Sequence, residues 1–160
     1  MTDLREQVFQ ALFGLLAEAS WNIGTDDAPA VKQFVTKTRR IVLFDQVPTA
    51  QQPWVGQAEH GETFAQKTNL PYKRTWDASW MVYHQAGSDP KAVPTITNNL
   101  IISALERVIA PKPTDPGFLD ERNTLQGLVY HCFISGAVFK DPGDIDNQAL
   151  IVVPIKLLVP

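Results

Sequence analysis

Two adjacent residues, His131 and Cys132, are of types that do nucleophilic chemistry when they lie side by side. A neutral imidazole can take the proton of a thiol and leave a reactive thiolate. The surrounding segment LVYHCFISG favours a β-strand, in which neighbouring side chains point to opposite faces of the sheet. His131 therefore cannot activate Cys132, and we expect Cys132 to be a buried structural residue.

Carboxylate and histidine side chains raise the question of a metal site. Asp141, Asp144 and Asp146 lie together in KDPGDIDNQ, but the glycine and the closing glutamate of an EF-hand calcium loop are misplaced or absent. A solvated hairpin turn is the better interpretation of this segment. His60 and His84 have no second ligand at a metal-binding spacing, and we expect them at the surface or at an interface.

Other catalytic patterns do not occur in the sequence. The segment FISGA lacks the G-x-S-x-G frame of a nucleophilic serine, and the chain has no glycine-rich phosphate loop. We therefore expect a protein that is not an enzyme. The sequence predicts no catalytic residue and no site for a cofactor or a metal ion.

The composition indicates one globular domain spanning residues 1–160. Hydrophobic residues make up 44% of the chain and charged residues 19%, which is typical of a folded protein. The single cysteine excludes an internal disulfide and fits a reducing compartment such as the cytoplasm. A net charge of −3 disfavours generic binding to duplex DNA. No apolar run approaches the length of a membrane span, and the charged N-terminal segment MTDLREQVFQ does not indicate export.

Hydrophobic periodicity predicts an α+β fold. Apolar residues at helical spacing indicate helices over residues 4–17 and 95–110. Strand patterns occur once or twice within residues 31–47, and then over 54–59, 72–85, 125–139 and 149–160. We expect a mostly antiparallel four- to five-stranded sheet with two main helices packed on one face.

The expected strands are apolar on both faces. In TWDASWMVYHQ, residues 75–85, Trp80 and Val82 point to one face, and Met81 and Tyr83 to the other. Two helices cover only one face of such a sheet, so something else must cover the second. A long loop is one candidate, and a second copy of the chain is the other. Because large exposed apolar patches are rare on monomers, we expect a homo-oligomer.

Charged residues gather in separate segments of the chain. Such clusters are most often solvated loops, because exposed ion pairs contribute little. The alternative is a head-to-tail contact, in which surfaces of opposite sign on one chain complement each other in neighbouring copies. The candidate interface residues are Lys37, Arg39, Arg40, Lys73, Arg74, Asp141, Asp144 and Asp146, with further acidic residues at Asp26 and Asp27.

The order of segments over nearly the full chain resembles the tail terminator, or tail completion, proteins of long-tailed bacteriophages. The likeness rests on spacing and on a few individually weak features. These are the pair Arg39–Arg40, Gln52–Pro53 before a strand, Trp76 opening the long strand, Leu125-x-Gly127, and the last strand around Pro154.

This resemblance implies a virion protein, assembled in the host cytoplasm, that forms a ring, commonly a hexamer, at the head-proximal end of the tail. Such a ring ends growth of the tail tube and offers a surface to the head. The implied partners are other copies of the chain, the major tail tube protein and a connector or head-closure protein, and DNA only as it passes through the central channel. Head-closure proteins of the neck are a close alternative. A different class also stays open, a monomeric domain with a small-molecule pocket between helix and sheet.

Overall fold

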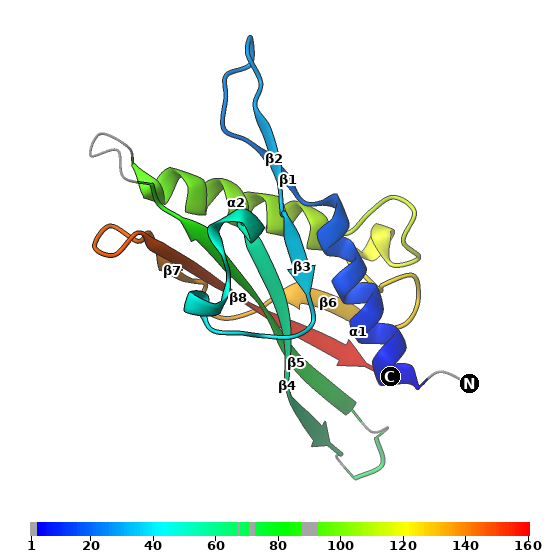
Figure 1. Cartoon of the computed structure of the whole chain (residues 1–160). Helices are drawn as coiled ribbons and strands as arrows, with labels where there is room; N and C mark the ends of the chain where they lie inside the picture. Colours follow the sequence, from blue (N-terminus) through cyan, green and yellow to red (C-terminus); the bar gives the residue numbers. More distant parts are fainter. Residues whose placement is uncertain (1–2, 67, 71–72, 88–92) are drawn as a thin grey trace.

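A long antiparallel pair of strands, β5 (Lys73–Gln85) and β8 (Gln148–Val159), forms the centre of the fold (Figure 1). The computed structural model describes residues 3–66, 68–70, 73–87 and 93–160. The β5–β8 ladder runs from the Arg74–Val159 pair to the Gln85–Gln148 pair without a register shift. This ladder is the central axis of the sheet.

The main sheet is mixed, curled and five strands wide, in the order β3-β4-β5-β8-β6. β3 is parallel to β4, all other pairs are antiparallel, and β7 shares the edge of β8 with β6. The expected α+β class and mostly antiparallel sheet are therefore confirmed. A separate hairpin of β1 and β2 projects from the body (Figure 1). The remaining strands are β1 (Ser20–Asn22), β2 (Val31–Gln33), β3 (Thr36–Thr38), β4 (Trp54–Ala65), β6 (His131–Ile134) and β7 (Phe139–Asp141).

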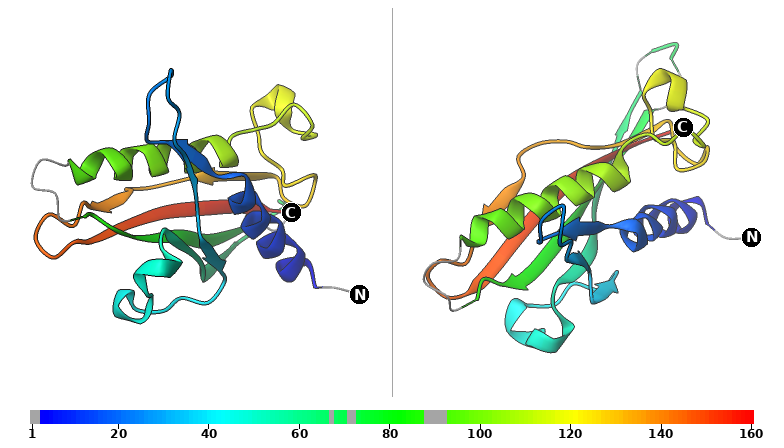
Figure 2. Two further views of the ribbon diagram at one scale, coloured as in Figure 1. Left: turned by 45° about the horizontal axis from the view of Figure 1, so that its top comes forward. Right: turned by 90° about the horizontal axis from the view of Figure 1, so that it is seen from above.

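Two helices, α1 (Leu4–Gly14) and α2 (Pro94–Ile109), lie on the same side of this sheet (Figure 2). The Asp3 side chain caps α1 by accepting a hydrogen bond from the Arg5 amide. Pro94 occupies the first turn of α2, where its missing N–H costs nothing. No helix among the described residues is long and apolar enough to cross a membrane.

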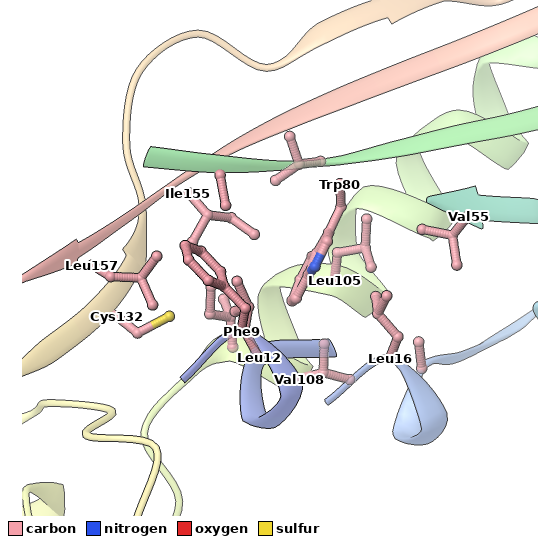
Figure 3. Packing of buried hydrophobic residues seen from close by; sticks show 14 of the residues in the cluster. Phe9, Leu12, Leu16, Val55, Trp80, Leu105, Val108, Cys132, Ile155 and Leu157 are labelled. Atoms are coloured by element: carbon pink, nitrogen blue, oxygen red, sulfur yellow. The ribbon is translucent and has the colours of Figure 1, made fainter. Parts of the chain in front are cut away.

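The core lies between the helices and the inner face of the sheet (Figure 3). The inner face of β5 carries Trp76, Ala78, Trp80 and Val82, all nearly fully buried as their alternation predicts. The Phe9 ring of α1 stacks on Trp76 with a centroid separation of 5.6 Å. The other fully buried side chains include Leu12, Leu16, Ile101, Leu105, Ile151, Ile155 and Leu157.

Two strand predictions were wrong in extent. Residues 125–139 do not form one strand, because Leu125, Gln126 and Gly127 adopt left-handed backbone angles and the amides of Gly127 and Val129 bond back to the Thr124 carbonyl. This segment is apolar because its turn packs into the core. In the other direction, β4 extends beyond residue 59 to Ala65, with a register shift between Glu59 and Glu62. The mostly polar residues there fit a hairpin arm whose two faces are both exposed to solvent.

Candidate assembly surfaces

The structure separates the histidine and cysteine that first suggested chemistry. Cys132 is buried on the inner face of β6, and its burial raises the thiol pKa to about 12. His131 lies on the outer face, where its Nδ1 accepts a hydrogen bond from the Asn123 amide at 3.2 Å and its ring stacks on Phe133. Both residues have structural contacts and do not face one another.

One predicted interface arginine has an intramolecular role. The Arg39 guanidinium lies between two carboxylates, with Nη1 at 2.5 Å from Glu6 of α1 and Nε at 3.0 Å from Glu59 of β4. These contacts, first the hydrogen bond to Glu6, raise the arginine pKa. Arg39 thus ties α1 to the edge of the sheet.

The neighbouring basic residues on the same edge differ from Arg39. Lys37 and Arg40 are exposed, and neither side chain forms an ion pair with any residue that the structure describes. The pair Arg39–Arg40 is thus split, one member bound internally and the other available to a partner.

The basic residues Lys73 and Arg74 lie at the start of β5, beside the end of β8. Arg74 donates hydrogen bonds to the Pro160 carbonyl, with Nη2 at 2.7 Å, and its guanidinium lies 5.5 Å from the Trp76 ring centroid. Lys73 is exposed, and its side chain has no hydrogen-bond partner within the described part of the chain.

The acidic residues lie at the opposite end of the β5–β8 ladder (Figure 1): Asp141 ends β7, and Asp144 and Asp146 lie in the turn between β7 and β8. Asp141 and Asp146 shape this turn by accepting hydrogen bonds from the amides of Gly143 and Gln148. The Asp144 carboxylate bonds to none of the described residues. Among these residues no cluster of three or more potential ligands could hold a metal ion.

The second apolar face of the sheet is covered in part by the chain's own loop. Trp54 and Tyr83 stack with a centroid separation of 4.6 Å, and Phe44 and Val47 of the 39–53 loop pack against them. The Tyr83 hydroxyl donates a 2.8 Å hydrogen bond to the Val42 carbonyl, and burial raises its pKa. Of the two candidates for covering this face, the chain's own loop covers the end near Tyr83, and the expected homo-oligomer stays a prediction for the remainder.

The rest of that face stays accessible. Most side chains on it are half-buried or exposed, and the apolar ones come from four strands. They are Met81, Phe133, Phe139, Val152, Pro154 and Leu158, with a loose pair between Lys156 and Asp77 at 4.0 Å. This remainder is the part of the sheet that a neighbouring subunit can cover.

A hollow of 530 Å³ lies between α1 and the 111–128 loop, where a small-molecule site would be sought. Its only buried carboxylate, Asp115, accepts hydrogen bonds from the amides of Gly117, Thr124 and Gln126 and from the Thr124 hydroxyl. Although burial acts to raise its pKa, these bonds hold the pKa of Asp115 below its usual value. The Asp115 carboxylate thus orders the loop, and among the described residues that line this hollow no other carboxylate is buried.

His84 is not at the surface, contrary to expectation. It is buried near the end of β5, and its Nε2 lies 2.5 Å from the Asn98 side-chain oxygen. Asn98 in turn donates to the Asp141 carbonyl at 3.1 Å. These two contacts join the first turns of α2 to β5 and to β7, the strand that precedes the acidic turn. His60 is exposed and contacts the Ser79 hydroxyl at 2.8 Å.

One exposed residue was missed by sequence reasoning. Ile145 lies at the tip of the acidic turn between Asp144 and Asp146, and its side chain is fully exposed. The sequence signal that could have identified it is an isoleucine within an otherwise polar turn segment, KDPGDIDNQ.

No known family model matches this sequence, and no curated protein matches it either.

Proposed function

We propose that this chain is a virion structural protein that forms a ring at the head-proximal end of a phage tail tube. The ring ends polymerisation of the tube and presents the surface to which the head is joined. The proposal combines the resemblance in segment order with the surfaces of the fold.

One observation carries the proposal. A single sheet bears unlike surfaces at its two ends, acidic at the β7–β8 turn and basic at the start of β5. A head-to-tail ring needs such unlike, complementary surfaces, because each subunit meets a different face of the next. The accessible apolar remainder of the outer sheet face supplies further surface to bury.

A cap also needs separate surfaces for its two axial neighbours. The β1–β2 hairpin and the β4–β5 hairpin arm project away from the body in different directions (Figure 1). Exposed Ile23 and Val31 on the first, and exposed Leu70 at the tip of the second, are suited to contacts outside the subunit.

The decisive experiment deletes the gene from the phage that carries it. If the chain is the terminator, the tails are abnormally long or frayed and do not join filled heads. Tails of normal length beside heads that leak DNA assign the chain to head closure instead. Infectious virions made without the protein reject both functions.

A purified system separates these outcomes further. Adding the protein to polymerising major tail tube protein is expected to shorten the tubes in electron micrographs, because a bound ring blocks the growing end. A matched addition of the Arg40→Ala variant tests whether this free arginine contributes to the contact. Unchanged tube lengths with the unmodified protein count against the terminator function.

A further inference from the structure

The acidic β7–β8 turn carries an apolar knob at its tip. Ile145 is fully exposed, and charged residues flank it on both sides. An exposed isoleucine contributes nothing to folding here, since its side chain contacts no core. The flanking Asp144 and Asp146 carboxylates are exposed as well. This arrangement, one apolar anchor between two acids, is suited to a basic pocket with an apolar floor.

Such a pocket exists at the other end of the same strands. A groove of 460 Å³ lies where β5 begins and β8 ends. Leu158, Val159 and Tyr130 provide apolar surface, and Lys73 and Arg74 provide positive charge. The Arg122 guanidinium lies 4.2 Å from the centroid of the Tyr130 ring, but it is already paired with Asp120 at 3.2 Å, so Lys73 and Arg74 are the cations of the groove. The remaining lining residues are Thr75 and Pro160.

The knob cannot enter the groove of its own chain. The β5–β8 ladder separates them, and from the Arg74–Val159 pair to the Gln85–Gln148 pair it spans about 35 Å at about 3.3 Å per residue. Any contact between the two is therefore a contact between copies, and it is heterologous.

We propose that the Ile145 knob of one copy docks in the Lys73–Arg74 groove of the next, with Asp144 and Asp146 facing the basic rim. The inference rests on the proposed ring and names the surfaces that join its subunits. Rim charges of opposite sign guide the approach and set the register, and the buried isoleucine slows dissociation.

Cross-linking between two variants that each carry one added cysteine tests this contact directly. Ile145→Cys and Thr75→Cys proteins are mixed at tens of micromolar and treated with a short bismaleimide. Native Cys132 does not interfere, because it is buried and its pKa is about 12. We expect a linked heterodimer from the mixture, and much less product from either variant alone.

The matched control uses another exposed apolar residue. Leu119 is 93% exposed in the loop after α2, and that loop lies at the groove end of the molecule, away from the acidic turn (Figure 2). A mixture of Leu119→Cys with Thr75→Cys is expected to give only background product. Equal yields from the two mixtures overturn the proposal, since they indicate random encounter.

A charge exchange tests the register of the contact. Adding Asp144→Lys to the Ile145→Cys copy, or Lys73→Glu to the Thr75→Cys copy, should each lower the yield about fivefold. The two exchanged copies together should recover most of the product, because the opposite charges face each other again. Failure of recovery, with both variants folded by circular dichroism, overturns the pairing of Asp144 with Lys73.

These results are separable from the function proposed above. A ring in sedimentation with no Ile145–Thr75 product means that subunits join through other surfaces, and the terminator function stands. A specific cross-linked product from the purified variants, together with normal tails on phage that lack the protein, means that the contact is real and the proposed function is wrong.

Discussion

At the scale of single residues, several buried polar groups of this chain stabilise its structure. Asp115 is the clearest case, because its carboxylate accepts hydrogen bonds from several backbone amides of a loop that has little regular structure. Cys132 is similar in being buried, with its thiol pKa raised to about 12. The exposed groups Arg40, Lys73 and Asp144 are different, since no described residue pairs with their side chains.

We expect Asp115→Asn to lower the free energy of unfolding by about 1–3 kcal/mol at neutral pH, because an amide nitrogen would face donors that now meet a carboxylate oxygen. The wild-type pKa is depressed in the folded state, so this stability is present above the unfolded pKa of about 4 and is lost as pH falls through the folded value. The difference between variant and wild type should therefore shrink in acid. Urea denaturation from neutral pH to about pH 3 measures both effects. Asp27→Asn, at an exposed turn, is the control and should change little.

The two adjacent arginines are expected to behave differently. Arg39→Ala removes the link between Glu6 and Glu59, and because these pairs are partly exposed we expect a loss of about 1 kcal/mol or less. Arg40→Ala should leave thermal stability unchanged and act only on assembly. Differential scanning calorimetry compares the two variants. An equal loss of stability in both would mean that Arg40 has an internal role as well.

At the scale of elements, the 39–53 loop acts as a third layer over part of the sheet. It places Phe44 and Val47 on the aromatic pair Trp54–Tyr83, and a hydrogen bond from Tyr83 secures its backbone. A loop with few ladder hydrogen bonds depends on such contacts to keep its place. The sheet end that it covers is therefore closed to a neighbouring subunit.

Tyr83→Phe is expected to destabilise the protein by about 1 kcal/mol, since the Val42 carbonyl loses its donor. The effect should concentrate in the loop, so hydrogen exchange of residues 41–53 should increase more than that of β5 and β8. Tyr130→Phe is the matched control, because Tyr130 is 59% exposed. Unchanged exchange in the Tyr83→Phe loop would show that apolar packing alone secures it.

At the scale of the whole molecule, charge is distributed along the axis of the β5–β8 ladder. A net charge of −3 conceals an acidic end and a basic end. Association through these ends should weaken as salt rises from about 0.1 M to about 1 M, because the Debye length falls from about 10 Å to about 3 Å. Sedimentation velocity across this range measures the change. Association that strengthens with salt would indicate that the apolar outer face alone joins the subunits.

Much of the fold was predictable because it depends on local periodicity. The alternation in residues 75–85 predicted β5 and its buried indole rings, and the apolar stripe around Leu105 predicted α2. Residues 125–130 were misread for the same reason, since an apolar turn that packs into a core has the composition of a strand. The candidate charged residues were identified from their types, but not which of them pair within the chain.

The sequence by itself determined the α+β class, the long central strand and the inner core, because hydrophobic spacing acts over a few residues. Only the tertiary structure decided which groups are free for a partner. Arg39 meets Glu6 and Glu59 across 33 and 20 residues of chain, and a loop covers Tyr83 from 41 residues away. Such contacts arise from the packing of distant segments, which no local pattern encodes. The same packing places Ile145 and its acidic neighbours at one end of the ladder and the basic groove at the other.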